Sequence, residues 1–232
     1  MTIRQLGIVV PCFNEENNLS ELISRCSKIA SIYSIEFILV DNGSTDQTAK
    51  KLAKNLPILG VEWFRIENNI GYGNGIIQGL KKLQNPWIGW IHADLQVEPE
   101  VLAHFLDLIN HEENLDFLKG QRKGRRISER FFTFAMSVYA TIRLRTVIND
   151  ANGQPTIMSR ALYKLWVKIP SDFSIDLSAL YLAKHHNAKI ARLPIKFNQR
   201  NAGQSSWNTG LISRIKLSKR TYMYINELAR SI

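Results

Sequence analysis

The chain has 232 residues, of which 45% are hydrophobic and 22% are charged, which is enough to bury a substantial core. This composition excludes a disordered chain, a fibrous repeat and a disulfide-stapled miniprotein. Thirty Lys and Arg face twenty Asp and Glu, a net charge of +10. Residues 1–118 carry nine basic and fifteen acidic side chains, whereas residues 119–232 carry twenty-one and five. The second half therefore favours an anionic partner, such as a nucleic acid, a lipid headgroup or a phosphorylated substrate.

The cysteines and the apolar stretches indicate the cellular compartment and whether the chain crosses a membrane. Cys12 and Cys26 have no metal-ligand spacing, and no charged-then-apolar leader precedes the first strand-like segment. We therefore expect a protein of the reducing cytoplasm. The longest strongly apolar stretch without a charge runs from Phe131 to Ile142. It is shorter than the roughly 18 residues that a spanning helix needs, so we expect the chain to contact a membrane without crossing it.

Short β-branched runs alternate with helix-length amphipathic segments through the first 120 residues. This alternation predicts a parallel sheet covered by helices. Strands are expected at Leu6–Val10, Glu36–Val40, Val61–Ile66, Trp87–Ile91 and Asp116–Lys119. Helices are expected at Asn18–Ala30, Asp46–Asn55, Gly73–Leu83 and Pro99–His111.

The pattern changes beyond residue 120. A basic loop from Gln121 to Arg126 comes first, and a turn-rich stretch covers residues 149–155. Further helices are expected at Ser128–Ile148, at Ile175–His186 and from about Thr209 onward, with strands at Thr156–Ser159 and Lys189–Phe197. Because no linker or repeat interrupts the chain, we expect a single domain over residues 1–232.

Polar side chains follow four of the expected strands. In an open parallel sheet, ligands bind beyond the carboxyl ends of the strands. Asn, Asp, Gly and Pro are common in any turn, so one such loop carries little weight, but four together indicate a binding site. The four loops are Pro11–Glu16, Asp41–Ser44, Asn68–Gly73 and His92–Gln96.

Some residues of these loops suggest a definite chemistry. The Asp94 carboxylate is a hard oxygen ligand suited to Mg²⁺ or Mn²⁺, which in turn binds phosphate oxygens. His92 is a second metal ligand, a hydrogen-bond donor to a phosphate, or an ordinary turn histidine. Asp41 is placed to accept hydrogen bonds from a ribose or a base. The glycines at 71, 73 and 75 allow close backbone approach at a helix start, although glycine spacing alone is weak evidence.

In their order along the chain, these segments resemble a known family. Pro11–Glu16, Val40–Asp46, Asn69–Gly73 and Ala93–Gln96 are similar to the corresponding motifs of family 2 glycosyltransferases with the GT-A fold. The similarity is strongest to the dolichol-phosphate mannosyltransferase-like and bacterial polyprenyl-phosphate glycosyltransferase branch. It implies an α/β fold of the Rossmann-like GT-A type, with a mostly parallel central sheet flanked by helices and basic amphipathic helices in the C-terminal half. The resemblance continues through Asn152–Pro155, Phe173–Asp176 and Arg200–Ser206 and covers nearly the whole chain.

The resemblance also implies roles for individual residues. It implies a GDP-sugar or UDP-sugar donor bound by residues 1–120, a Mg²⁺ or Mn²⁺ ion, and an acceptor and membrane side formed by residues 121–232. The residues expected to bind the nucleotide sugar are Pro11, Asn14, Glu15, Asp41, Gly73, Ala93, Asp94, Gln96, Arg200 and Ser205. The expected metal ligands are His92, Asp94 and Gln96, and the expected catalytic residues are Asp94, Arg122, Arg126, Asp176 and Arg200.

The chain departs from the family pattern at three points. His92 stands where the family usually has an acidic residue, which bears on metal affinity. Gln204 occupies a position often held by lysine, which removes one phosphate-binding charge. The C-terminal spanning helices of some relatives have no counterpart here, so we expect any membrane contact to be peripheral.

The nature of the acceptor decides whether the reaction needs a base. A lipid phosphate is already ionised near neutral pH, whereas a saccharide hydroxyl must lose its proton to a carboxylate, for which Asp176 is the candidate. Asp176 also begins an expected helix, where a capping role explains it equally well.

The basic half offers a surface for a lipid acceptor. An apolar segment, Phe131–Ile142, lies between arginines on both sides, as in interfacial helices that bury an aromatic face at the acyl boundary. A buried core helix is the alternative interpretation. The tail from Trp207 to Arg230 interleaves apolar and basic residues and is either a second surface anchor or a solvated helix packed on the sheet.

The sequence therefore favours an inverting glycosyltransferase that moves a sugar from a nucleotide donor to a polyprenyl phosphate, at the cytoplasmic face of a membrane. Transfer to a saccharide hydroxyl of a cell-surface glycan is the second hypothesis, and a catalytically degenerate membrane-associated homologue is the third. A nucleic-acid binder would suit the isoelectric point near 9.7, but Asp41 and Asp94 would repel a polyanion. We therefore expect no nucleic-acid partner. The sequence leaves the oligomeric state open.

Overall fold

The computed structural model describes residues 4–123, 127–198 and 211–230, with side chains from residue 134 onward in the helix at 127–144 and from residue 218 onward in the helix at 211–230. Its elements follow the expected alternation of strands and helices. The strands are β1 (Leu6–Cys12), β2 (Ile35–Asn42), β3 (Val61–Ile66), β4 (Trp87–Trp90), β5 (Phe117–Lys123), β6 (Thr156–Ser159) and β7 (Ile190–Lys196). The helices are α1 (Leu19–Ile32), α2 (Thr48–Asn55), α3 (Tyr72–Lys82), α4 (Val101–His111), α5 (Ile127–Leu144), α6 (Arg160–Lys164), α7 (Ile175–His185) and α8 (Leu211–Arg230).

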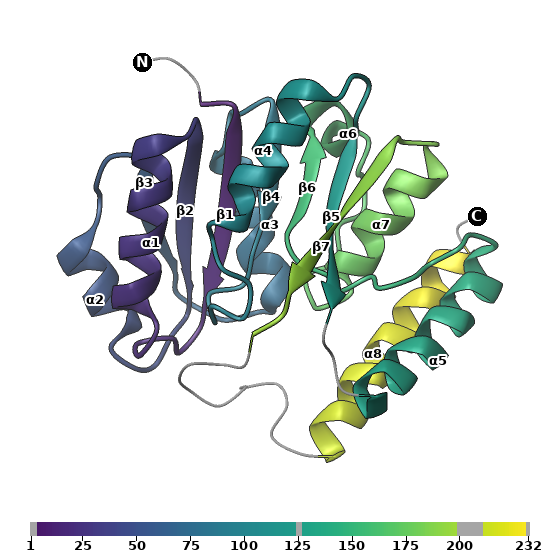
Figure 1. The fold of residues 1–232 in the computed structure, drawn as a ribbon. Helices are drawn as coiled ribbons and strands as arrows, with labels where there is room; N and C mark the ends of the chain where they lie inside the picture. The colour runs from purple at the N-terminus through teal and green to yellow at the C-terminus, as the bar shows by residue number, and fades with distance from the viewer. Residues whose placement is uncertain (1–3, 124–126, 199–210, 231–232) are drawn as a thin grey trace.

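The strands form one mixed sheet in the order β3-β2-β1-β4-β6-β5-β7. Every neighbouring pair is parallel except the two made by β6, which runs antiparallel to both β4 and β5. Both halves of the chain therefore contribute to the same sheet. The mostly parallel α/β architecture predicted from the sequence is confirmed (Figure 1).

Helices cover both faces of the sheet and divide the core into two clusters. On one face α1, α2 and α4 pack on side chains such as Ile8 and Phe37, which are fully buried or nearly so. On the other face α3, α6, α7 and the end of α5 pack on side chains such as Val9 and Trp90. Burial on both faces explains why β1 and β2, in the interior of the sheet, are nearly continuous apolar runs.

Strand β5 is longer than the sequence indicated. We expected it to end at Lys119 and a basic loop to begin at Gln121, but residues 121–123 continue the strand in register with 194–196 of β7. The expectation was wrong because a partner strand about 70 residues further along the chain supplies the pairing. Residues 124–126, which include Arg126, lie outside the described residues.

Helices α5 and α8 lie side by side at one end of the sheet (Figure 1). The Tyr139 hydroxyl donates a hydrogen bond of 2.8 Å to Oδ1 of Asn226, and Arg143 Nε donates to the same oxygen at 3.0 Å. The Tyr139 and Tyr222 rings stack with centroids 4.8 Å apart. These contacts make the helix pair one unit. Within the described residues, no helix has the length and apolar character to span a bilayer.

Candidate functional site

The loops after β1 and β2 are tied together at the carboxyl ends of their strands. Asn14 adopts a left-handed backbone conformation with φ 56°, its amide donates to the Ser44 hydroxyl at 3.1 Å, and its side-chain oxygen accepts from the Thr45 amide at 2.9 Å. The Glu15 amide donates to the Thr48 hydroxyl at 2.9 Å. The two loops thus form one rigid rim, which places Asn14 and Glu15 beside the end of β2.

Asp41 is the last but one residue of β2, and its side chain is fully buried. Its Oδ1 accepts a hydrogen bond from the Ser44 amide at 3.0 Å, and its Oδ2 pairs with Nη1 of Arg65 at 3.1 Å. The sequence predicted that Asp41 contacts a ribose or base directly. In the structure its carboxylate orders the 41–44 turn and holds Arg65, a residue of β3 that the sequence analysis did not single out.

Pro11 and Gly73 are both engaged inside the fold. Pro11 belongs to β1, opposite Val40 of β2 and two residues beyond the last β1–β4 pair, so its missing amide hydrogen costs no bond to β4. A Cβ on Gly73 would collide with the backbone carbonyls of Pro170 and Asp172. The glycine is therefore required for packing of the 170–172 loop, and a role for either residue in nucleotide binding stays a prediction.

The turn after β4 carries Asp94 in a fixed conformation. Its Oδ1 accepts a hydrogen bond from the Gln96 amide at 3.1 Å, across Leu95, whose φ is 56°. The Gln96 side chain donates to the Asn198 carbonyl at 3.2 Å, and the Asn198 amide donates to the Gln96 carbonyl at 2.9 Å. This turn is thereby attached to the chain leaving β7. Ala93, between His92 and Asp94, is buried.

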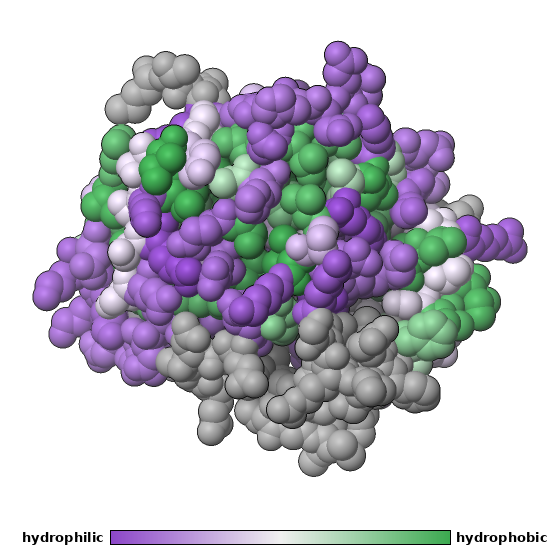
Figure 2. All heavy atoms as spheres, viewed as in Figure 1, coloured by the Kyte–Doolittle hydropathy of each residue, from purple (hydrophilic) through white to green (hydrophobic). Residues whose placement is uncertain are grey.

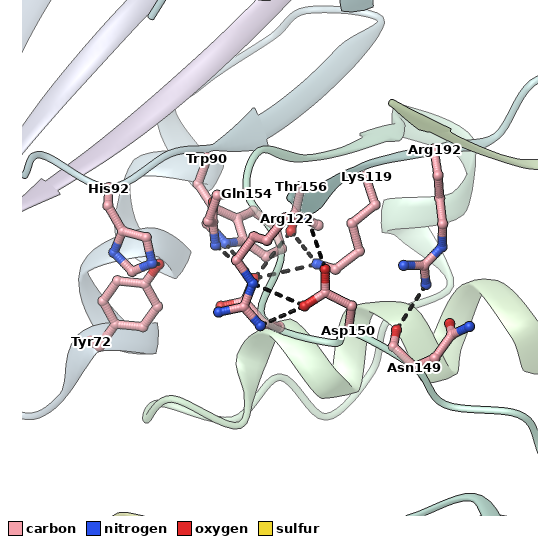
Figure 3. Close-up of polar contacts among 11 residues, drawn as sticks. Tyr72, Trp90, His92, Lys119, Arg122, Asn149, Asp150, Gln154, Thr156 and Arg192 are labelled. Atoms are coloured by element: carbon pink, nitrogen blue, oxygen red, sulfur yellow. Dashed lines mark hydrogen bonds and ion pairs between the residues drawn. The ribbon is translucent and has the colours of Figure 1, made fainter. Parts of the chain in front are cut away.

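His92 is part of an aromatic stack. The Tyr72 ring lies between Phe173 and His92, with ring centroids 4.5 and 5.1 Å away, and the Tyr72 hydroxyl is 3.5 Å from Nε2 of His92 (Figure 3). Burial raises the pKa of the Tyr72 hydroxyl well above its usual value, and the nearby carboxylates Asp176 and Asp94 add to this shift. Tyr72 therefore stays neutral. The stack fixes the imidazole against α3.

Among the described residues, no three His, Cys, Asp or Glu side chains are grouped so as to hold a metal ion. Mg²⁺ commonly binds through one or two carboxylates, several waters and the phosphates of a substrate, and Asp94 in its ordered turn suits that arrangement. The donor set here consequently fits an ion shared with a bound diphosphate.

Asp176 lies in a buried polar cluster, and it is not the cap of its helix. It belongs to the first turn of α7, is 2% exposed, and its Oδ1 accepts hydrogen bonds from Trp90 Nε1 at 3.1 Å, Gln154 Nε2 at 2.9 Å and Thr156 Oγ1 at 3.1 Å. The Lys119 ammonium lies 3.6 Å away and donates to Thr156 Oγ1 at 2.6 Å. This cluster was not predicted from the sequence, although a lysine between Leu118 and Gly120 in an apolar strand was a usable signal.

The arginine cluster lies beside this buried group (Figure 3). Nε and Nη2 of Arg122 both donate to Oδ1 of Asp150, the former at 2.9 Å, and the Arg122 amide donates to Oδ2 at 3.0 Å. Arg192 of β7, in register with Lys119, donates to the Asn149 carbonyl at 3.0 Å. The structure thus gathers Lys119, Arg122 and Arg192 around two carboxylates. Arg200 and Ser205, like Arg126, lie outside the described residues.

The burial of Lys119 predicts an unusual pH dependence of stability. Burial lowers the pKa of Lys119 from 10.5 to about 8, with Asp176 acting in the opposite direction. Between these two pH values the unfolded state binds a proton that the folded state has lost, so the contribution of Lys119 to stability rises with pH. Relative to Lys119→Met, the wild-type free energy of unfolding should increase from pH 8 to 10.5 by at most about 3 kcal/mol.

Urea unfolding of both proteins at several pH values measures this difference. Taking the difference cancels the titration of groups common to both proteins. A difference that stays constant or decreases over this range would contradict the assignment.

Comparisons with known proteins identify the family. The model of glycosyl transferase family 2 matches residues 7–180, and the chain belongs to this family. The chain is 30% identical to dodecaprenyl-phosphate galacturonate synthase of Rhizobium johnstonii, over 95% of this chain and 67% of that protein. It is 23% identical to dolichol-phosphate mannosyltransferase of Pyrococcus furiosus, over 87% of this chain. The expected polyprenyl-phosphate branch of the family is confirmed.

The relatives are longer than this chain, and a solved structure supports the fold. The chain spans 58% of the length of the Pyrococcus enzyme and 39% of the undecaprenyl-phosphate 4-deoxy-4-formamido-L-arabinose transferase of Proteus mirabilis. Glucosyl-3-phosphoglycerate synthase of Mycobacterium tuberculosis, crystallised with Mn²⁺, UDP-glucose and phosphoglyceric acid, superposes with a TM-score of 0.74 at 17% identity. The match covers 99% of this chain and 80% of that one. The GT-A fold expected from the sequence is confirmed.

Proposed function

We propose that the protein is an inverting glycosyltransferase that moves a sugar from a GDP-sugar or UDP-sugar to a polyprenyl phosphate at the cytoplasmic face of a membrane. The named relatives act with dolichyl, dodecaprenyl or undecaprenyl phosphates, which supports this acceptor class. One domain over residues 1–232 would then carry the donor site in residues 1–120 and the acceptor side in residues 121–232.

The ordered 94–96 turn is the observation that carries the donor half of the proposal. It places the buried Asp94 carboxylate beyond the carboxyl end of β4, and the neighbouring strand β1 leads into the rim formed by the loops after β1 and β2. Asp94, with Gln96, would hold Mg²⁺ or Mn²⁺, and the ion would supply positive charge to the departing diphosphate. His92, held against Tyr72, would orient the turn or contribute a third ligand. Arg65 would face the nucleoside from the end of β3.

The burial of Asp176 supports a phosphate as the acceptor. A general base must reach the proton that it removes, and the Asp176 carboxylate is nearly inaccessible and already accepts three hydrogen bonds. In the proposed reaction an ionised phosphate oxygen attacks the anomeric carbon. The bond from that carbon to the donor diphosphate breaks, and the nucleoside diphosphate leaves with the electron pair. No proton has to be removed, so Asp176 would position side chains without acting as a base.

Titration calorimetry with UDP and with GDP, each with and without Mn²⁺, tests the donor half. We expect one nucleotide to bind, and to bind more tightly with the metal. Mn²⁺-independent binding of both, or binding of neither, would contradict the donor site.

The α5–α8 pair is the proposed membrane-contacting surface. Phe134, Val138 and Ile142 of α5 follow one another at intervals of four residues and are 66%, 41% and 70% exposed, so they form a stripe along one face. Figure 2 shows apolar side chains at the right-hand side of the molecule, on the part of this helix pair whose side chains are described. Tyr222 and Met223 of α8 are also exposed. Since Ala140 and Leu144 are buried, the core-helix interpretation holds only for the opposite face of α5.

Polar replacement of the stripe should release the protein from vesicles. Each exposed apolar side chain gains roughly 1.5–3 kcal/mol on full burial, so Phe134→Ser with Ile142→Ser should weaken binding to anionic vesicles at least tenfold. Co-sedimentation with phosphatidylglycerol-containing vesicles measures the fraction of protein bound. Val167→Ser is the matched control, because Val167 is 89% exposed and lies outside the pair. Equal binding by all three proteins would rule out this surface.

A further inference from the structure

Asp150 is the only described residue to which the Arg122 side chain donates. Two side-chain nitrogens of Arg122 share Oδ1 of Asp150, and the backbone amide of the same residue uses Oδ2. Both side chains are largely buried. Nη1 takes part in none of these bonds. Because both guanidinium nitrogens converge on a single carboxylate oxygen, Asp150 sets the orientation of the guanidinium plane.

The fold places Asp150 at this point with little freedom. Its φ is 41°, and its carbonyl accepts the Gly153 amide at 3.1 Å, which closes a tight turn. The Gly120 amide donates to the Pro155 carbonyl at 2.9 Å, and a Cβ on Gly153 would collide with the Gly120 carbonyl. The 150–155 turn is thus pressed onto β5 two residues before Arg122.

Two further cations near the Arg122–Asp150 ion pair leave the cluster with a net positive charge. Lys119 and Arg192 lie opposite each other on neighbouring strands. The charge of Lys119 helps to lower the pKa of Asp150, and the charge of Asp150 partly offsets the lowering of the Arg192 pKa by burial. Burial opposes ionisation of Asp150, but Arg122 and Lys119 hold the pKa of that carboxyl below its usual value. Lys119, Arg122 and Arg192 carry three positive charges against the two negative charges of Asp150 and Asp176. One positive charge remains for an anion.

We propose that Asp150 is a positioning residue, which orients the Arg122 guanidinium so that it binds the phosphate of the polyprenyl acceptor. The inference rests on the proposed function and deepens it. Asp150 touches neither substrate in this account and acts only through Arg122. Its loss should therefore change acceptor binding and leave donor binding as it is.

Steady-state kinetics of Asp150→Asn with undecaprenyl phosphate and the nucleotide sugar test the inference. The acceptor KM should rise roughly tenfold, a coupling of about 1.4 kcal/mol, with the donor KM changed less than twofold. Asp116→Asn is the matched control, because Asp116 accepts the Lys189 amide at 3.0 Å at the opposite end of the same strand pair. It should leave both constants within twofold.

A double-mutant cycle shows whether Asp150 works through Arg122. In an Arg122→Gln background, adding Asp150→Asn should change the acceptor KM less than twofold, whereas a full additional tenfold rise would overturn the inference. Should Asp150→Asn fail to fold, Arg122→Lys serves as the test variant. Lysine keeps the positive charge but lacks the planar guanidinium that Asp150 orients. An unchanged acceptor KM in Arg122→Lys would also overturn the inference. If the wild type transfers no sugar to any polyprenyl phosphate, the proposed function itself fails.

Discussion

Replacing Asp94 with asparagine should lower kcat by roughly 10²–10³-fold, the magnitude found when one group that stabilises charge in a transition state is removed. Asparagine keeps a side-chain oxygen that can accept the Gln96 amide, so the turn should persist while its negative charge is lost. Asp94→Ala should abolish transfer as well, and it should also loosen the turn. Initial rates with saturating donor and Mn²⁺ measure both effects.

Two controls distinguish the effect of losing the Asp94 charge from the effect of disturbing the 94–96 turn. Thermal unfolding should show Asp94→Asn within a few degrees of the wild type. Asp107→Asn removes a carboxylate that is 71% exposed on α4 and should leave kcat unchanged. Retention of full activity by Asp94→Asn would remove this residue from the metal site.

Arg122→Ala should reduce kcat/KM for the acceptor by roughly 100-fold, because truncating one partner of a desolvated charge pair costs about 2–5 kcal/mol. The substitution would remove the positive charge that we propose binds the acceptor phosphate, and it leaves Asp150 without its ion-pair partner. Initial rates over a range of undecaprenyl phosphate concentrations, at fixed saturating donor, measure the effect.

Lys123→Ala is the matched control for Arg122. Lys123 is the next residue of β5 and is exposed, so it has the same charge without the contact to Asp150. It should change acceptor kcat/KM less than twofold. Equal losses in the two variants would mean that only the diffuse charge of the basic segment matters, which would contradict a specific role for Arg122.

The local pattern of the sequence was sufficient to predict the positions of most strands in the sheet. β3 at Val61–Ile66 and β6 at Thr156–Ser159 have the expected bounds, because runs of β-branched and aromatic residues favour strands independently of their partners. The short helix α6 was not predicted. It spans only five residues, with Ser159 accepting the Leu162 amide at its start, and such a helix has too few turns for a periodic pattern.

Pairings between distant residues explain what the sequence did not indicate about the site. Arg65 and Asp41 meet because β2 and β3 are neighbours, and Asp176 meets Lys119 because α7 packs on β5 and β6. An acidic residue at a strand end or helix start suggests an exposed ligand or a cap. Only the packed fold shows that Asp41 and Asp176 are buried and that each has a cationic partner.

The product formed by the wild-type protein is the most direct test of the proposed function. The protein would be incubated with Mn²⁺, undecaprenyl phosphate in vesicles, and a panel of UDP-sugars and GDP-sugars, and the lipid phase would be analysed by mass spectrometry. The proposed function predicts one glycosyl undecaprenyl phosphate, with inverted anomeric configuration and one nucleoside diphosphate released per sugar transferred. Transfer to a saccharide hydroxyl with none to the lipid, or no transfer from any donor, would contradict it.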